Sequence, residues 1–234
     1  FFVLAGLGLI MLILSYFDQG ETAPASDKSI LGQFQNYPIL LTSKRFWGYC
    51  LASAFGSGAF FAYLGGAPAV GAEVYALDPQ TVGLFLGAPA VGYFFGNFIA
   101  GRYSKSIGID LMVLYGLSLA LIGMTLSLMV SGIGYGSALS FFGLMTFVGL
   151  GNGMSIPNAT AGMLAIKPEL AGTASGLGSA MTIGGGAALS ALAGPVLHMG
   201  SGDLALIALM WLSVCIGILL ILLVIKRNRT LTID

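Results

Sequence analysis

The side chains that could do chemistry are few, and most of them are polar without being charged. Otherwise apolar stretches of the chain carry a sparse set of amide and hydroxyl groups: Asn97, Thr146, Asn152, Ser155 and Asn158. Such groups donate and accept hydrogen bonds without the cost of burying a full charge. They suit the recognition of a small molecule inside a mostly apolar site.

Residues that would support catalysis or metal binding do not cluster. The single histidine, His198, falls in a predicted loop, and no His, Cys, Asp and Glu group shows metal-ligand spacing. Cys50 and Cys215 fall within apolar stretches, where cysteine is most often a small packed residue. A P-loop is absent, and the glycine pairs lack a dinucleotide-binding context. The sequence therefore predicts no catalytic residue, no metal and no bound cofactor.

Aromatic side chains concentrate in two apolar segments, residues 46–72 and 79–101. Aromatic surfaces with a few polar groups suit bulky, apolar and variable ligands. The alternative for each ring is packing against lipid or against a neighbouring helix. We name five candidates for contact with a ligand cavity: Phe60, Phe61, Tyr93, Thr146 and Asn152.

Membrane helices must position these residues. The mean hydropathy is +0.95, and 8% of residues are charged, against about 25% in a soluble domain. A helix needs about 20 apolar residues to cross a membrane. The uncharged stretches predict an all-α integral membrane bundle with seven spans: residues 1–17, 46–72, 79–101, 111–131, 137–157, 171–194 and 204–225.

The charges predict an orientation. All nine Lys and Arg residues lie on alternate connections between the spans, and positive residues collect on the cytoplasmic side. We therefore expect residues 18–45 to form a cytoplasmic central loop, residues 46–226 a six-helix bundle and residues 227–234 a cytoplasmic tail. No basic cluster suggests a nucleic-acid partner.

The start of the chain admits two interpretations. Phe1 already lies in apolar sequence and is not Met, which favours a fragment with further sequence upstream. The stretch Ala23-Pro24-Ala25 looks like a signal-peptide cleavage site, but the positively charged region that precedes such a site is missing.

Small residues mark where helices could approach closely. Gly172, Gly176 and Gly184 share one face of the predicted span 171–194, and small residues four apart allow backbones to meet in a membrane. This pattern fits two interpretations. The helix could rock against its neighbours, or it could simply pack against them without moving. A second face of the same span carries Gly178, Thr182, Gly186, Ser190 and Gly194.

The end of the predicted span 46–72 is a candidate gate. Gly65, Gly66 and Pro68 weaken a helix there, although a fixed kink is the alternative. Glu73 is expected at the outer membrane interface. A break at residues 65–68 would bring Glu73 deeper, where it is a candidate proton or cation site.

Three stretches carry a resemblance to a known family: SKRFWGYCLASAFGSGAFFAYLGGAPAV (43–70), the basic loop GRYSKSIG (101–108) and PNATAGMLAIKPELAGTASGLGSA (157–180). They resemble the second half of a major facilitator superfamily transporter, in the group of Bcr/CflA drug:proton antiporters. The basic loop lacks the acidic residue that is usual in the superfamily, since Tyr103 and Ser104 stand nearby instead.

The resemblance implies a fold and a function. Residues 1–17 would be the last helix of the N-terminal half, and substrate would bind at the midplane between two six-helix halves that alternate access. It implies export of small, largely apolar compounds across a bacterial inner membrane, with the proton gradient as energy source. The implied partners are substrate, protons, lipid and the missing N-terminal half, and the acid that couples protons is expected upstream of Phe1.

Two other functions remain as alternatives to drug export. One is a major facilitator transporter of a metabolite such as a sugar or organic acid, and the other is a membrane-integral enzyme or scaffold.

Overall fold

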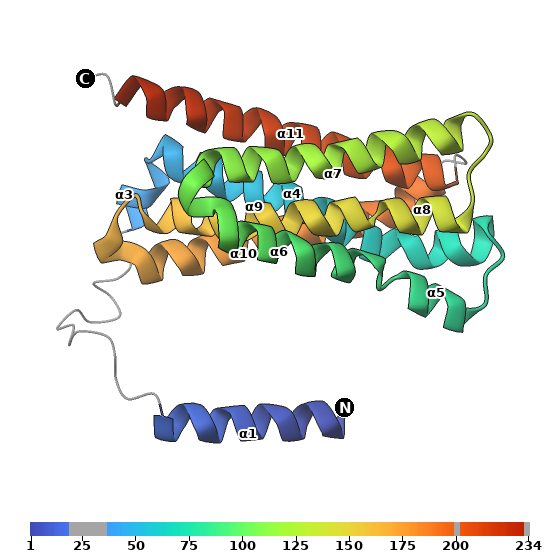
Figure 1. The fold of residues 1–234 in the computed structure, drawn as a ribbon, viewed down its shortest axis with the longest axis horizontal. Helices are drawn as coiled ribbons and strands as arrows, with labels where there is room; N and C mark the ends of the chain where they lie inside the picture. The colour runs from blue at the N-terminus through green and yellow to red at the C-terminus, as the bar shows by residue number, and fades with distance from the viewer. Residues whose placement is uncertain (19–36, 199–201, 232–234) are drawn as a thin grey trace. The chain divides into compact units, whose positions relative to one another are not determined.

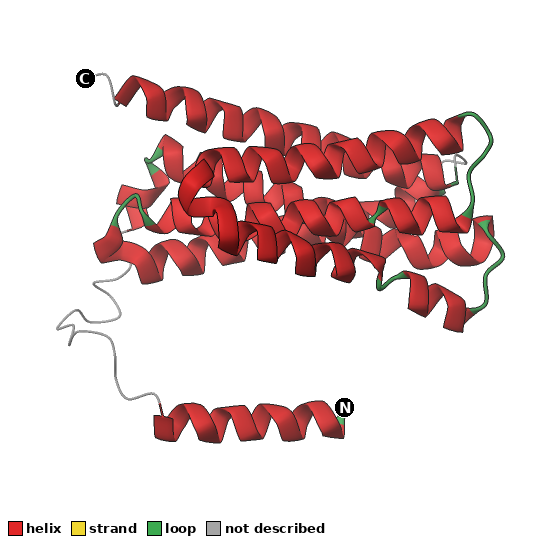
Figure 2. Cartoon of the chain, viewed as in Figure 1, coloured by secondary structure: helices red, strands yellow, loops and turns green. Residues whose placement is uncertain are grey.

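A computed structural model describes residues 1–18, 37–198 and 202–231, which form helices and connections without a strand (Figures 1 and 2). Contacts divide the chain into two units, Phe1–Asn36 and Tyr37–Asp234. In the first unit, α1 (Phe2–Asp18) is an apolar helix of 17 residues. Lys28 and most of the predicted central loop lie outside the described residues.

The second unit is a bundle of helices whose apolar segments are long enough to cross a membrane. The prediction of an all-α membrane fold is confirmed, with six such segments among the described residues. Two of the segments, Pro79–Ile107 and Ala138–Leu164, contain two α-helices each. The elements are α3 (Tyr37–Leu41), α4 (Lys44–Ala69), the π-helix η1 (Val70–Val74), α5 (Pro79–Phe85), α6 (Ala88–Ile107), α7 (Ile109–Gly132), α8 (Ala138–Leu144), α9 (Thr146–Leu164), the 3₁₀ turn η2 (Pro168–Leu170), α10 (Ala171–Leu197) and α11 (Asp203–Leu231).

The helices run further than their apolar stretches predict. Residues 102–110 were expected to form a loop, but α6 continues to Ile107 and α7 begins at Ile109. Gly108 alone makes the turn, with φ of +91°, a conformation that side chains with a Cβ rarely adopt. Pro157, expected near a helix end, lies inside α9. The polar ends stay helical because a helix satisfies its own backbone hydrogen bonds in water as well as in lipid.

Helices α4 and α9 hold the bundle together. Helix α4 packs against α9, α10 and α11, and α9 also packs against α6 and α7. A Cβ on Gly92 of α6 would lie 1.9 Å from the Thr146 carbonyl oxygen, and one on Gly149 of α9 would lie 1.8 Å from the Pro89 carbonyl oxygen. No side chain fits there, so these glycines set the separation of α6 and α9.

The other side of α9 shows the same close approach. A Cβ on Gly151 would lie 2.3 Å from the Gly116 carbonyl oxygen of α7, and one on Gly116 would lie 2.5 Å from the Gly151 carbonyl oxygen. Helix α9 is therefore in backbone contact with α6 on one side and with α7 on the other.

Carboxylates connect α4, α7 and α11 at both ends of the bundle. Where α4 and α7 begin, the Tyr49 hydroxyl donates to Asp110, and Asn228 Nδ2 of α11 donates to Asp110 Oδ2 over 2.7 Å. At the opposite end, Asp203 of α11 accepts from Tyr75 and from Ser131. These hydrogen bonds fix the three helices relative to one another.

Candidate functional site

A cavity of about 380 Å³ lies among α4, α6, α9 and α10. Four of the five residues that the sequence nominated for a ligand cavity line it: Phe60, Phe61, Tyr93 and Asn152. The structure thus brings these four side chains together. The remaining lining residues are Ser57, Pro89, Ala90, Gly149, Ile156, Thr182 and Ile183.

Helix α4 supplies the aromatic wall of the cavity. Ser57, Phe60 and Phe61 share one face because they are three and four residues apart. The rings of Phe60 and Phe61 meet edge to face with centroids 6.2 Å apart. A Cβ on Gly186 of α10 would lie 2.2 Å from the Phe61 ring, so the absence of a side chain at Gly186 makes room for that ring.

Helices α6 and α9 supply the opposite wall. Tyr93 is 43% exposed, which leaves much of its ring accessible. Asn152 is 4% exposed and is the one amide among the lining residues. The contact between Pro89 and Gly149 lies in the same wall, so the backbone packing of α6 on α9 determines how far apart these two side chains lie.

The electrostatic character of the cavity is neutral. None of its lining residues carries a charge, and the polar groups are the hydroxyls of Ser57, Tyr93 and Thr182 and the amide of Asn152. Ser57 Oγ already donates to the Ser53 carbonyl oxygen over 2.8 Å. An ionised ligand would gain no opposite charge from these walls, whereas an uncharged apolar ligand with one or two polar groups would match them.

Thr146, the fifth predicted residue, does not line this cavity. It begins α9, one turn before Gly149, and its carbonyl oxygen faces Gly92. Helical spacing could have found two of the residues that the prediction missed, since Ser57 precedes Phe61 by four positions and Ile156 follows Asn152 by four.

The proposed gate element is an uninterrupted part of α4. Pro68 lies inside the helix, which passes into the π-helical turn η1. A Cβ on Gly65 would lie 2.5 Å from Ser190 Oγ, and one on Gly66 would lie 2.8 Å from Leu206. These two glycines are therefore packing positions, and their role as a gate stays a prediction.

The two small faces of α10 have different surroundings. Gly172, Gly176 and Gly184 have nothing within 4 Å of where a Cβ would lie, so a Cβ at these positions would meet no other helix of the described bundle. On the other face, a Cβ on Gly178 would meet Met163 at 2.8 Å, and one on Gly186 would meet Phe61. Packing inside this bundle uses the second face.

The two titratable residues singled out near helix ends lie at the surface. Helix α4 has no break at residues 65–68, and Glu73 in η1 is exposed. Its location at the membrane interface stays a prediction, and so does its role as a proton site. His198, at the end of α10, is also exposed. The part of the chain that the structure describes has no group of three His, Cys, Asp or Glu residues placed to hold a metal ion.

Comparison with known proteins places the chain among transporters. The family model described as Major Facilitator Superfamily matches residues 1–191. The "Bicyclomycin resistance protein homolog" of Haemophilus influenzae is 25% identical over 195 residues, which are 82% of this chain and 49% of that protein. The "Uncharacterized MFS-type transporter YdgK" of Bacillus subtilis is 31% identical over 110 residues, which are 46% of this chain and 27% of that protein.

The chain thus spans about half the length, or less, of these curated relatives. No solved structure matches it. The similarity to a bicyclomycin resistance homologue agrees with the resemblance to the Bcr/CflA group. The family model covers most of the chain, and the structure supplies the all-α membrane bundle that such a protein requires. The chain therefore belongs to the Major Facilitator Superfamily.

Proposed function

We propose that this protein exports small, largely apolar compounds across the bacterial inner membrane in exchange for protons. The chain supplies one wall of the substrate path and part of its gates. The cavity among α4, α6, α9 and α10 is where it contacts the compound. In this proposal Asp234 and the end of α11 face the cytoplasm, and the proton gradient supplies the energy, so no bound cofactor is needed.

The composition of the cavity wall carries the proposal. Phe60, Phe61 and Tyr93 offer ring surfaces, Asn152 offers one amide, and no lining residue is charged. A site that bound an organic acid would need a cation to balance the carboxylate, and this wall has none. The name of the Haemophilus influenzae relative refers to resistance to bicyclomycin, which supports a drug-like compound as substrate.

Transport by everted membrane vesicles tests the proposal. The protein is expressed from its complete gene, and the vesicles are offered bicyclomycin, an uncharged apolar fluorescent dye and a radiolabelled organic acid. We expect uptake of bicyclomycin or the dye when the vesicle interior is made acidic, and no uptake of the organic acid. Vesicles from cells without the gene give the background.

A protonophore separates coupling from transport. Uptake that stops when the protonophore is added supports exchange with protons. Uptake that continues unchanged would refute proton coupling. Selective uptake of the organic acid would refute the assignment of an apolar substrate.

A further inference from the structure

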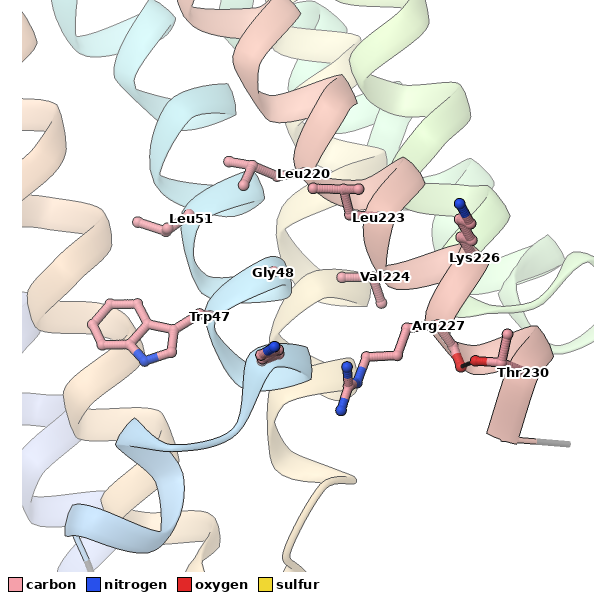
Figure 3. A pocket seen from close by; sticks show the side chains of 10 residues that line it. Trp47, Gly48, Leu51, Leu220, Leu223, Val224, Lys226, Arg227 and Thr230 are labelled. Atoms are coloured by element: carbon pink, nitrogen blue, oxygen red, sulfur yellow. Dashed lines mark hydrogen bonds between the residues drawn. The ribbon is translucent and has the colours of Figure 1, made fainter. Parts of the chain in front are cut away.

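A second cavity lies between α4 and α11, and it is separate from the cavity that the aromatic wall of α4 lines. It has a volume of about 520 Å³ and lies where α4 begins and α11 ends (Figure 3). None of its lining residues belongs to the proposed substrate cavity. It therefore needs its own explanation.

The inner part of this cavity is an apolar slot. A Cβ on Gly48 of α4 would lie 2.1 Å from a methyl carbon of Val224 of α11, so the two helices touch at the floor. Leu51, Leu220 and Leu223 form its sides. Leu223 is 64% exposed, so the slot is open toward the surroundings of the bundle. In a bilayer those surroundings are acyl chains.

The outer part is positively charged. Lys44, Lys226 and Arg227 line this end, and the cavity has no acidic lining residue. Figure 3 shows Arg227 reaching from α11 toward the beginning of α4, while Lys226 points away from it. The positive charge is thus spread along the rim, where Thr230 adds a hydroxyl.

Trp47 indicates how deep this rim lies in the membrane. Its indole N–H donates to the Leu41 carbonyl oxygen over 2.7 Å, which fixes the ring at the edge of the cavity. Tryptophan is enriched where lipid headgroups meet the acyl region. The cations are therefore at headgroup level and the slot is at acyl-chain level.

We propose that this cavity, the α4–α11 groove, binds an anionic glycerophospholipid. The phosphate lies between Lys44 and Arg227, Lys226 adds positive charge to the rim, and an acyl chain occupies the slot above Gly48 and Val224. A free anion would use the cations but not the slot, and a neutral lipid would use the slot but not the cations. Basic pockets between membrane helices on the cytoplasmic side are typical sites for anionic headgroups.

Fluorescence quenching of Trp47 by brominated lipids tests this proposal. The full-length protein is reconstituted in phosphatidylcholine vesicles that contain brominated phosphatidylglycerol or, at the same mole fraction, brominated phosphatidylcholine. The signal of a Trp47→Phe variant is subtracted so that only this indole is followed. We expect phosphatidylglycerol to quench Trp47 at a roughly tenfold lower mole fraction than phosphatidylcholine.

Two triple variants distinguish a built site from general charge attraction. The groove variant combines Lys44→Gln, Lys226→Gln and Arg227→Gln, and we expect it to lose the preference for phosphatidylglycerol. The control variant combines Arg102→Gln, Lys105→Gln and Lys167→Gln, which removes the same charge from the same end of the bundle outside the groove. We expect the control to keep the preference. The single variant Arg227→Gln serves if the groove variant fails to fold, and it should weaken the preference.

Several outcomes would overturn the proposal. Equal quenching by the two lipids in the unmodified protein would show that the headgroup charge is not recognised. Loss of the preference in the control variant would assign it to general surface charge. Competition by soluble glycerol phosphate would show a site for a free anion. Absence of quenching by either lipid would show that another part of the protein covers the groove.

Discussion

The Tyr75 hydroxyl donates a hydrogen bond of 2.6 Å to Asp203 Oδ2, joining two residues that are 128 positions apart in the chain. Ser131 donates to the same oxygen over 2.5 Å. Asp203 is 8% exposed, so these hydroxyls replace the water that a carboxylate otherwise binds. The Asp203 cluster is therefore a fixed connection among the end of η1, the end of α7 and the start of α11.

Removing a hydroxyl from this cluster should lower the stability of the bundle. We expect Tyr75→Phe to cost about 1–2 kcal/mol, because one hydrogen bond to a charged group is lost. Asp203→Ala should cost more, since it leaves two hydroxyls without their acceptor. Thermal unfolding in detergent, followed by circular dichroism at 222 nm, measures both. Tyr135→Phe is the control, because Tyr135 is 78% exposed, and an equal loss there would contradict the account.

The stability that the Tyr75 side chain contributes to the bundle should depend on pH. Burial, together with the hydrogen bond to Asp203, raises the pKa of Tyr75 above its usual value. The folded state therefore favours the neutral phenol, and its contribution is complete below the ordinary tyrosine pKa of about 10. Above that pH the unfolded chain loses a proton that the folded chain keeps, so the contribution falls. The difference in Tm between the unmodified protein and Tyr75→Phe should be constant from pH 7 to 9 and smaller at pH 11. A larger difference at pH 11 than at pH 7 would contradict this prediction.

The glycines between α6 and α9 give a prediction about packing. In Gly92→Ala the new Cβ would lie 1.9 Å from the Thr146 carbonyl oxygen, and that backbone cannot move aside cheaply. We expect a loss of about 1–3 kcal/mol, as for other overpacked interiors. Gly101→Ala in the same helix has open space around the new Cβ and should be neutral or slightly stabilising. Equal unfolding temperatures for the two variants would contradict the close approach of α6 and α9.

Composition predicted the membrane helices well because the bilayer imposes a simple requirement of length and apolarity. It failed at their ends. Arg102 and Lys105 were expected in a loop, yet both belong to the last two turns of α6. Charged residues at a membrane surface are compatible with helix or loop, and only the backbone conformation of Gly108 shows where the turn occurs.

The candidate cavity was predictable in part. Residue type pointed to Phe60, Phe61, Tyr93 and Asn152, because aromatic and amide groups in apolar helices suggest recognition. Which face of each helix meets the cavity depends on neighbours that are distant in sequence, and this explains why Thr146 was misplaced. Small residues recur on both α9 and α10, but only contacts in the fold show that α9 is packed tightly on two sides.

The exposed face of α10 leads to a prediction that separates transport from folding. Gly176→Leu and Gly184→Leu place side chains where no other helix of this bundle lies within 4 Å. We expect both variants to fold and to lose most transport activity, if this face approaches the other half of the transporter during the cycle. Gly186→Leu is the contrasting variant and should fail to fold, because the new side chain meets the Phe61 ring. Normal transport by both Gly176→Leu and Gly184→Leu would refute a moving contact on this face.

Protection of a cysteine from alkylation tests the cavity itself. Tyr93 lines the cavity, whereas the next residue, Phe94, is 68% exposed and does not line it. Tyr93→Cys and Phe94→Cys are made in a background without other cysteines, and N-ethylmaleimide labelling is timed with and without a compound that the vesicles transport. We predict that the compound slows labelling severalfold at position 93 and leaves position 94 unchanged. Equal labelling rates at position 93 with and without a saturating compound would contradict the assignment of this cavity to substrate.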